Sequence, residues 1–460
     1  MNQIHDKFNP FSTRMLAESL PQIFIDSFAF YYNQLISGST GLIAETEIRP
    51  VSFVPDMENF PERLKAVGER VLHKTAVIKL NGGLGTSMGL EKAKSLLPVI
   101  DGLSFLDIIA RQAIRSSVPL ILMNSFVTNA DSLAALKRYP ELRGKLAKSF
   151  VQHKELKIGQ SDFSPVAWPQ NPSLEWCPPG HGDVYIALVT SGSLDKLLEE
   201  GYHYAFVSNA DNLGAVLDKL LLGYFAENGF PFMMEVADRT EMDRKGGHLA
   251  QNQSDDRFIL RESAQCPTAD MDYFQDITRH KFFNTNNLWV NLQSLRKIMV
   301  DRDYNLGLPM IRNRKTVDPR DKTSIPVFQI ETAMGSAIGV FDGANAVRVS
   351  RKRFAPVKKT NDLLAVRSDV YQLTEDFHVI RNPQRQRGPL LIELDDRFYK
   401  FVSDLDARFP HGAPSLLECD ALRIVGDFRF EKGVVCRGTV ELINDTERQI
   451  VIAEETILEG

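Results

Sequence analysis

The chain of 460 residues is poor in cysteine, and the four that it has, Cys177, Cys266, Cys419 and Cys436, lie far apart. No C-x-x-C pair occurs among them, which argues against a structural zinc site and against a disulfide framework. This cysteine usage fits a reducing compartment best, and we therefore expect the protein in the cytoplasm.

Long apolar runs and a strong excess of one charge are also missing. No apolar stretch approaches the roughly 20 residues that a membrane-spanning helix needs, so we expect no membrane role. The first residues, MNQIHDKFNP, lack the apolar segment of a secretory signal, and no signal peptide is expected. The formal net charge of −5 argues against broad binding to nucleic acids.

The length predicts two or three domains. Residues 1–69 are expected to form an N-terminal helical extension and linker that packs on the main domain. Apolar residues recur there at helical spacing, and Pro21 is expected to start or kink a helix. Residues 70–384 form the predicted catalytic domain, and residues 385–460 form a small β-rich C-terminal domain.

Strand and helix patterns alternate along residues 70–384. Apolar runs typical of strands are 76–80, 119–123, 204–208, 232–236 and 288–291, and helical patterns include 105–115, 130–138 and 213–227. This alternation predicts an α/β fold, in which a mostly parallel, mixed sheet is flanked by helices in a Rossmann-like arrangement. Because ligands bind at the carboxyl ends of such strands, the loops 81–89 and 209–211 are expected on one rim of the sheet.

The C-terminal segment has a different pattern. After Ser415 come short β-rich runs, several of them separated by Gly426, Gly433 and Gly438. Short strands at close spacing favour a small β-helix or solenoid.

The first strand of the main domain leads into a glycine-rich loop, Asn81-Gly82-Gly83-Leu84-Gly85. Such a loop can bring several backbone N–H groups close to a phosphate chain, although an ordinary tight turn is the alternative. The dinucleotide pattern G-x-G-x-x-G fails at Met88, and the pattern G-x-x-x-x-G-K-S/T fails because Ala93 precedes Lys94. A strand, a glycine loop and following lysines still favour a polyphosphate site.

Four motifs together resemble one known family. They are KLNGGLGTSMG with the later KS (residues 79–95), PPGHGD (178–183), NAD (209–211) and RFAPVKKTNDLL (353–364). They are similar to those of the UTP–glucose-1-phosphate uridylyltransferase family, in its eukaryotic-type branch, and the resemblance runs from residue 41 to residue 414. It implies a nucleotidyltransferase fold with a small C-terminal left-handed parallel β-helix, which in that family often makes oligomer contacts.

The resemblance also implies the reaction. Uridylyl transfer from UTP to glucose 1-phosphate would give UDP-glucose and pyrophosphate, with Mg²⁺ as the cofactor. The attacking phosphate is already an anion, so the protein has to position two anions and neutralise the leaving group rather than supply a general base. UTP and glucose 1-phosphate are therefore the expected partners, with homo-oligomer formation through the C-terminal domain as a further expectation.

Site residues are carried over from the matching motifs. The expected catalytic residues are Lys94 and Lys358. The expected nucleotide-binding residues are Leu80, Asn81, Gly82, Gly83, Met123, Gln152, Pro179, Gly180, His181, Asn209 and Asp211. The expected sugar-binding residues are Gly247, Glu262, Phe283, Asn284 and Asn286.

Several of these residues have ordinary structural alternatives. Asp211 follows a strand and is well placed to hold Mg²⁺, but the same segment could cap a helix near Leu213 through Asn212. Met123 could simply belong to the core. The chain also departs from the family at Glu91, where many members have lysine, and Lys92 could partly replace that charge.

Other functions remain open at this stage. The same chemistry could act on galactose 1-phosphate or on an N-acetylhexosamine 1-phosphate. A non-catalytic protein that binds nucleotide sugars is a different class, and the presence of Lys94, Asp211 and Lys358 argues against it. An NAD dehydrogenase fails on its glycine spacing.

Overall fold

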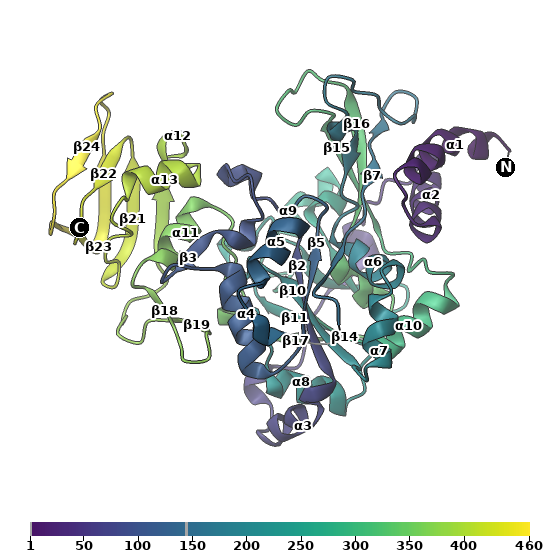
Figure 1. The fold of residues 1–460 in the computed structure, drawn as a ribbon, viewed down its shortest axis with the longest axis horizontal. Helices are drawn as coiled ribbons and strands as arrows, with labels where there is room; N and C mark the ends of the chain where they lie inside the picture. The colour runs from purple at the N-terminus through teal and green to yellow at the C-terminus, as the bar shows by residue number, and fades with distance from the viewer. Residues whose placement is uncertain (1, 143–145) are drawn as a thin grey trace.

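The computed structural model of the protein describes residues 2–142 and 146–460. An α/β body forms the centre of the molecule, with the N-terminal helix pair at one end and a β-rich C-terminal part at the other (Figure 1).

A mixed sheet runs through the centre of the body (Figure 1). Its strand path is β1 (Ile48–Pro50), β12 (His248–Asn252), β14 (Phe282–Asn291), β10 (Tyr204–Asn209), β2 (Thr75–Asn81), β5 (Leu120–Asn124) and β6 (Ser149–Val151). Beside this path, β11 (Phe232–Asp238) pairs with β14 and β17 (Asn345–Arg348), and β13 (Phe258–Arg261) pairs with β12.

Most strands of this sheet point in the same direction. β2 pairs in parallel with β5 and β10, β5 with β6, and β11 with β17. β14 lies between β10 and β11 and runs antiparallel to both. The predicted mixed, mostly parallel sheet is confirmed, but β14 begins at Phe282, before the predicted start at residue 288. Its polar amides pair within the sheet, so the apolar pattern marks only its second half.

Helices cover both faces of the sheet, as the alternating pattern predicts. Val77 of β2 packs on one face with α4 (Phe105–Ser116), whereas Ala76 and Ile78 pack on the other with α6 (Val184–Thr190) and α7 (Ser193–Glu199). The remaining helices of the body are α3 (Arg63–Val71), α5 (Asn129–Leu136), α8 (Lys219–Glu227), α9 (Met271–Gln275) and α10 (Leu292–Asp301). A strand that is buried on both faces has a continuous apolar run, which is why β2 was recognisable from the sequence.

The predicted helix at 213–227 starts later than expected. α8 begins at Lys219, and Asp218 caps it by accepting hydrogen bonds from the backbone N–H groups of Leu220 and Leu221. Asn212 is therefore not the helix cap; its amide oxygen instead accepts hydrogen bonds from the N–H groups of Gly214 and Ala355. Asn212 thus joins its own loop to the distant segment around Ala355.

The N-terminal segment forms two helices, α1 (Asn2–Ala17) and α2 (Gln22–Ile36), and Pro21 directly precedes α2 as predicted. Aromatic side chains of both helices, among them Phe11 and Tyr32, are buried with Ile158 and Phe328 of the body. The strands on this side are β7 (Glu155–Leu156), β8 (Ile158–Gly159), β9 (Trp176–Cys177), β15 (Met310–Thr316) and β16 (Pro326–Thr332).

The C-terminal part consists of strands that pair in parallel. β20 (Leu391–Leu394), β21 (Cys419–Val425), β23 (Val435–Ile443) and β25 (Ile457–Glu459) form one sheet, and β22 (Phe428–Phe430) pairs with β24 (Ile450–Ile452). Their core is shared with α11 (Thr360–Arg367), α12 (Asp396–Tyr399) and α13 (Val402–Arg408). Four short strands belong to the region beside this C-terminal part (Figure 1). They are β3 (Pro98–Ile100), β4 (Leu103–Ser104), β18 (Tyr371–Leu373) and β19 (Val379–Arg381). In the described part of the chain, none of the helices is long and apolar enough to cross a membrane.

Candidate active site

A cleft opens at the carboxyl ends of β2 and β10, with a volume of about 320 Å³. The described residues that line it are Leu80, Asn81, Gly82, Gly83, Lys94, Ser95, Gln152, Pro178, Gly180, His181, Asn209, Ala210 and Asp211. The two predicted loops thus meet on one rim, where ligands of parallel α/β sheets bind. The size is that of a small-molecule site. We call this cleft the rim pocket.

The glycine loop brings its backbone close to Gln152, one of the predicted nucleotide-binding residues. A Cβ atom on Gly82 would lie 2.8 Å from Oε1 of Gln152, so any other residue at position 82 would displace that side chain. Asn81 anchors the start of the loop, because its Nδ2 donates to Asn124 Oδ1 (2.7 Å) and to Ser132 Oγ (2.8 Å). An added Cβ on Gly83 would meet nothing within 4 Å, which leaves this part of the loop open to a ligand.

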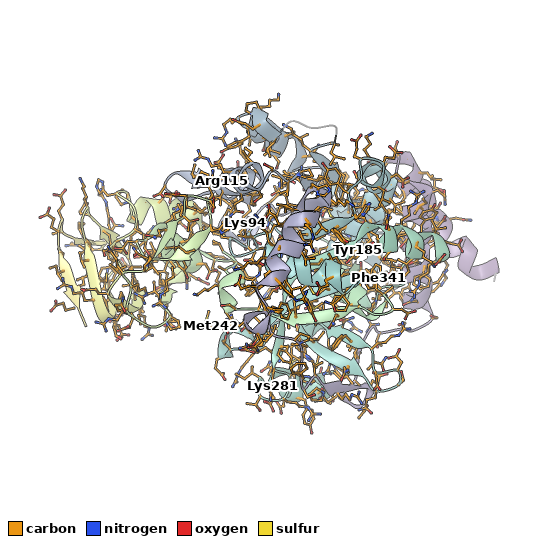
Figure 2. The ribbon with its side chains drawn as sticks, turned by 90° about the horizontal axis from the view of Figure 1, so that it is seen from below. Lys94, Arg115, Tyr185, Met242, Lys281 and Phe341 are labelled. Atoms are coloured by element: carbon orange, nitrogen blue, oxygen red, sulfur yellow. The ribbon has the colours of Figure 1, made fainter. Side chains whose placement is uncertain are left out.

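Lys94 and Asp211 form an ion pair inside the rim pocket. Nζ of Lys94 donates to Oδ2 of Asp211 at 2.8 Å, and the two side chains are 13% and 27% exposed. The backbone N–H of Lys94 donates to Gly83 O, which ties the lysine to the glycine loop. Lys94 and Arg115 are both labelled in Figure 2; the side chain of Lys94 is 13% exposed, whereas that of Arg115 is 62% exposed. A cation and a carboxylate are therefore held together where a phosphate chain and a metal ion would meet.

Ser95, which was not among the predicted site residues, lies beside this pair. Ser95 is 2% exposed and lines the rim pocket, and its Oγ has no hydrogen-bond partner among the residues that the structure describes. Buried hydroxyl groups normally have a partner, so a ligand oxygen would satisfy this one. Its sequence signal is the KS motif, in which it directly follows Lys94.

The Pro-Gly-His turn is pressed against the end of β16. Gly180 has φ +79°, and a Cβ atom there would lie 2.5 Å from Thr332 O, so only glycine fits. Nδ1 of His181 accepts a hydrogen bond from the backbone N–H of Met334 (2.9 Å), and burial lowers the pKa of His181 to about 4. His181 is partly exposed and lines the rim pocket. The neutral imidazole carries its hydrogen on Nε2.

Two of the predicted nucleotide-binding residues, Met123 and Pro179, are not among the residues that line the rim pocket. Met123 is 1% exposed and lies in the hydrophobic core with α6 and α7, as its structural alternative stated. Its position in β5 points it into the sheet's packed face instead of toward the rim. Pro179 lines a smaller cavity behind the Pro-Gly-His turn, and its carbonyl oxygen accepts a hydrogen bond from Thr332 N.

The predicted sugar residues meet one another at the first half of β14. A Cβ atom on Gly247 would lie 2.5 Å from Oε2 of Glu262, and the backbone N–H of Asn284 donates to Gly247 O at 3.1 Å. Nδ2 of Asn284 donates to Oδ1 of Asn286 at 2.9 Å. Phe283, one residue earlier in β14, is 7% exposed. The result is a small group of amides and one carboxyl group, which suits hydrogen bonding to hydroxyl groups.

Glu262 is the titratable member of this group. Burial raises its pKa to about 7, and the charge of Lys358 opposes that rise. The carboxyl group therefore holds its proton to a higher pH than an exposed glutamate does.

Lys358 lies in a neighbouring cavity rather than among the described residues of the rim pocket. That cavity has a volume of about 330 Å³ and is lined by Phe354, Asn361 and other residues of segments 351–366 and 390–392. The preceding residue, Val357, donates its N–H to Asp211 O at 3.1 Å, so the two segments are joined. The expected catalytic role of Lys358 remains a prediction.

Glu91 and Lys92, where the chain departs from the family pattern, are both exposed and outside the described lining of the rim pocket.

Comparison with known proteins identifies the family. A family model described as UTP--glucose-1-phosphate uridylyltransferase matches residues 25–437. The chain belongs to this family. The UTP--glucose-1-phosphate uridylyltransferase of Saccharomyces cerevisiae is 42% identical over 396 residues, which is 85% of this chain and 78% of that protein. The protein of the same name from Solanum tuberosum is 40% identical over 398 residues, which is 85% of this chain and 81% of that protein.

Solved structures agree with the assignment to this uridylyltransferase family. A variant of the UDP-glucose pyrophosphorylase of Leishmania major in complex with UDP-glucose is 41% identical, with a TM-score of 0.90 over 98% of both chains. The UDP-glucose phosphorylase of Trypanosoma brucei is 43% identical, with a TM-score of 0.88 over 99% of this chain and 98% of that chain.

A divalent cation, which uridylyl transfer in this family would involve, fits the residues of the rim pocket. Asp211 is the only carboxylate among its described lining residues, and no three His, Cys, Asp or Glu side chains in the described part of the chain gather into a metal cage. Mg²⁺ is commonly held by one or two carboxylates together with substrate phosphates, so a single partly exposed carboxylate is the expected donor set.

Buried residues hold the uridylyltransferase motifs in place through an ion pair and hydrogen bonds around Arg353. Nε of Arg353 donates to Oε2 of Glu235, and its Nη2 donates to Oε1, both at 2.7 Å. Asn287 and Asn212 each donate through Nδ2 to Arg353 O, at 3.2 and 3.1 Å. From the sequence, Arg353 could be recognised only as part of a motif, because its partner Glu235 lies in β11, far away along the chain.

Proposed function

We propose that this chain transfers the uridylyl group of UTP to glucose 1-phosphate and releases pyrophosphate, in a reversible reaction. The observation that carries the proposal is the Lys94–Asp211 pair in the rim pocket of a chain that belongs to the uridylyltransferase family. Relatives named for this reaction cover most of the chain, and a solved relative is described in complex with UDP-glucose.

Charge and position explain how the rim pocket would act. The phosphate of glucose 1-phosphate attacks the α-phosphorus of UTP as an anion, so no general base is needed. Lys94 lies beside the glycine loop and would neutralise the pyrophosphate as it leaves. Mg²⁺ bound at Asp211 would supply further positive charge to the phosphates. Because the lysine and the carboxylate pair with each other, each holds the other in place until the ligands arrive.

The nucleotide would be held by groups on both sides of the glycine loop. Gln152 can pair with uracil through its amide, which both donates and accepts hydrogen bonds. His181 offers the hydrogen on Nε2, because its Nδ1 is occupied by Met334 N–H. Asn209, at the end of β10, is proposed to contact the sugar nucleotide.

The hexose would lie against the group of Gly247, Glu262, Phe283, Asn284 and Asn286. Glucose 1-phosphate is the proposed acceptor, and galactose 1-phosphate and N-acetylhexosamine 1-phosphates are its competitors. Lys358 is proposed to balance charge on the acceptor side, where its effect on the pKa of Glu262 indicates proximity to this group.

One assay tests the proposal. Pyrophosphate release from UTP is measured with each sugar 1-phosphate, with and without Mg²⁺, for the wild-type chain, Lys94→Ala and Lys92→Ala. We expect the highest kcat/KM with glucose 1-phosphate, a loss of turnover of at least about 100-fold in Lys94→Ala, and a mild effect in the exposed control Lys92→Ala. Binding of UDP-glucose without any pyrophosphate release would instead favour the non-catalytic class.

The C-terminal part is proposed to form a left-handed parallel β-helix that makes contacts between copies of the chain. The parallel pairing of β21 with β23 and of β22 with β24 supports a coiled path. Ile443, Val451 and Ile457 are 55%, 53% and 51% exposed, which is unusual for such side chains. If this surface joins copies, Val451→Asp should lower the molecular mass in solution measured by light scattering; an unchanged mass would contradict the proposal.

The predicted domains, 1–69, 70–384 and 385–460, and a cytoplasmic location are retained as parts of this proposal. Burial of all four cysteines as free thiols suits a reducing compartment.

A further inference from the structure

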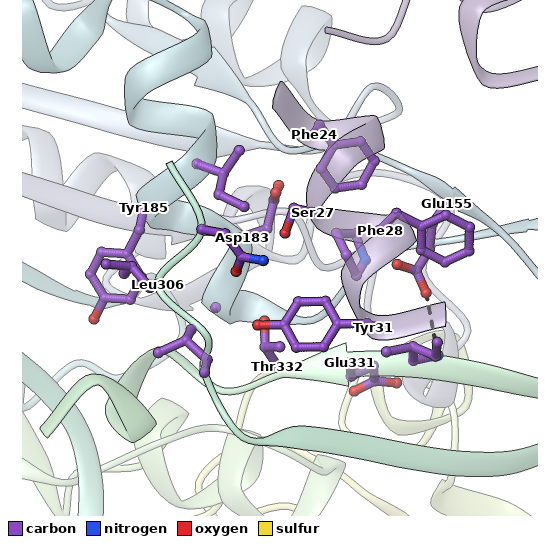
Figure 3. A pocket seen from close by; sticks show the side chains of 16 residues that line it. Phe24, Ser27, Phe28, Tyr31, Glu155, Asp183, Tyr185, Leu306, Glu331 and Thr332 are labelled. Carbon is purple, nitrogen blue, oxygen red and sulfur yellow. Dashed lines mark hydrogen bonds between the residues drawn. The ribbon is translucent and has the colours of Figure 1, made fainter. Parts of the chain in front are cut away.

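A small cavity lies behind the Pro-Gly-His turn, on the side away from the rim pocket. Its volume is about 30 Å³, and one of its walls is helix α2. Figure 3 shows Phe24, Ser27, Phe28 and Tyr31 of α2 on one side of this cavity, with Asp183 across from them. The turn at 178–183 therefore separates the two spaces: Gly180 and His181 line the rim pocket, whereas Pro179 and Gly182 line the cavity.

Asp183, at the end of this turn, contacts His153 through both of its carboxylate oxygens. It is 3% exposed; its Oδ2 accepts from the backbone N–H of His153 at 2.7 Å, and its Oδ1 lies 2.8 Å from Nδ1 of the same residue. His153 directly follows Gln152, which lines the rim pocket. One buried carboxylate thus fixes the position of Gln152 relative to the turn that carries His181.

The imidazole of His153 is held on its remaining sides. Its Nε2 is 3.0 Å from Oγ1 of Thr190 in α6, and the side chain is 7% exposed. The ring of Phe24 stacks on it with centroids 4.2 Å apart and an angle of 11° between the planes. Helix α2 therefore closes the face of the imidazole that the body of the protein leaves open.

We propose that helix α2 is part of the nucleotide site, and that Phe24, His153 and Asp183 are positioning residues that hold Gln152 and His181 at the separation that the uridine nucleotide requires. The inference rests on the proposed binding of a uridine nucleotide in the rim pocket. None of the three side chains lines the rim pocket, so they act through Gln152 and His181. Among the described residues, their hydrogen bonds and ring contacts do not reach the sugar group around Glu262, so their influence is confined to the nucleotide.

This proposal predicts a selective kinetic effect. A change that loosens the stack or the carboxylate bridge should weaken binding of UTP and of UDP-glucose, and should leave the KM for glucose 1-phosphate unchanged. Stacked aromatic pairs contribute about 0.5–1.5 kcal/mol beyond their buried area, which corresponds to an affinity loss of about 2- to 12-fold.

Two phenylalanine variants separate positioning from plain stability. Phe24→Leu keeps an apolar side chain and removes the stack on His153. Phe11→Leu is the matched control, because Phe11 is 0% exposed in the same helical core and stacks with Phe8 rather than with His153. KM values for both substrates and kcat are measured for each variant, and the Kd of UDP-glucose is measured by calorimetry.

We expect Phe24→Leu to raise the KM for UTP and the Kd of UDP-glucose about 2- to 12-fold, with kcat and the KM for glucose 1-phosphate within about twofold of wild type. Phe11→Leu should leave all of these constants unchanged. Equal effects of the two variants, or equal changes in the KM of both substrates, would overturn the proposal.

The carboxylate bridge gives an independent test. Asp183→Asn retains an oxygen that can accept the N–H of His153, whereas Asp183→Leu has none. We expect the loss of UDP-glucose affinity to be smaller in Asp183→Asn, with thermal melts showing that the compared variants are folded; the reverse order would count against the bridge. If the wild-type chain binds UDP-glucose but releases no pyrophosphate, the proposed function fails while these Kd comparisons still decide the role of α2.

Discussion

Replacing Glu262 by glutamine tests whether a buried carboxyl group is kept at a cost in stability. Burial raises the pKa of Glu262 from its ordinary value of 4.5 to about 7. Since the folded state has the higher pKa, it holds the proton more tightly than the unfolded state between these two values. The contribution of Glu262 to stability is therefore complete below about pH 4.5 and is lost as the pH rises through 7.

The magnitude follows from the two pKa values. A shift of about 2.5 units corresponds to about 3 kcal/mol between the protonated and the ionised carboxyl group. The amide of Glu262→Gln has the same shape and does not ionise. The free energy of unfolding of the variant minus that of wild type should therefore rise by about 3 kcal/mol between pH 4.5 and pH 8, and stay level above that.

Urea unfolding of both proteins at intervals from pH 4.5 to pH 8.5 measures this difference, and the subtraction removes the contributions of all other titrating groups. In parallel, the KM for glucose 1-phosphate should rise in Glu262→Gln, because a carboxylate that accepts hydrogen bonds from sugar hydroxyls is lost. A stability difference that does not change with pH would refute the reasoning about burial. A variant that is more stable and has an unchanged KM for every sugar 1-phosphate would refute the role in the sugar site.

Three further predictions concern the phosphate and nucleotide groups. Asp211→Asn should keep the fold, as judged by its melting curve, and lose at least about 100-fold in Mg²⁺-dependent turnover; unchanged Mg²⁺ dependence would mean that the metal is held elsewhere. Lys358→Ala should lower kcat far more than Lys359→Ala, because Lys358 contributes charge near Glu262; the reverse order would show that the wrong lysine was chosen. His181, with a pKa of about 4, should stay neutral above about pH 5, so its imidazole NMR signals should not titrate between pH 5.5 and 8. Because its folded pKa lies below the ordinary value of 6.5, its contribution to stability should be lost as the pH falls from about 6.5 toward 4, and a titration near pH 6.5 would contradict this environment.

Much of the main domain was predictable because burial leaves a local pattern. β2, β5, β10 and β11 are apolar runs between turn residues, and each was placed within about two residues of its observed bounds. β20 and β22, by contrast, were not predicted. The antiparallel direction of β14 is likewise not visible in any local sequence pattern.

The motifs were sufficient to recognise the family from the sequence alone. Their glycines, lysine and carboxylates stand at positions that the chain must present to a phosphate. Tertiary structure alone decided how these groups meet. Lys94 and Asp211 are 117 residues apart in the chain and 2.8 Å apart in the fold. Their contact depends on the parallel register of β2 and β10, which no local pattern encodes. The same holds for Met123, which faces the core because of its strand's orientation, and for Phe24, which reaches His153 only after α2 packs on the body. Local sequence records which side chains are buried, whereas the identity of their partners is set by packing over long separations in the chain.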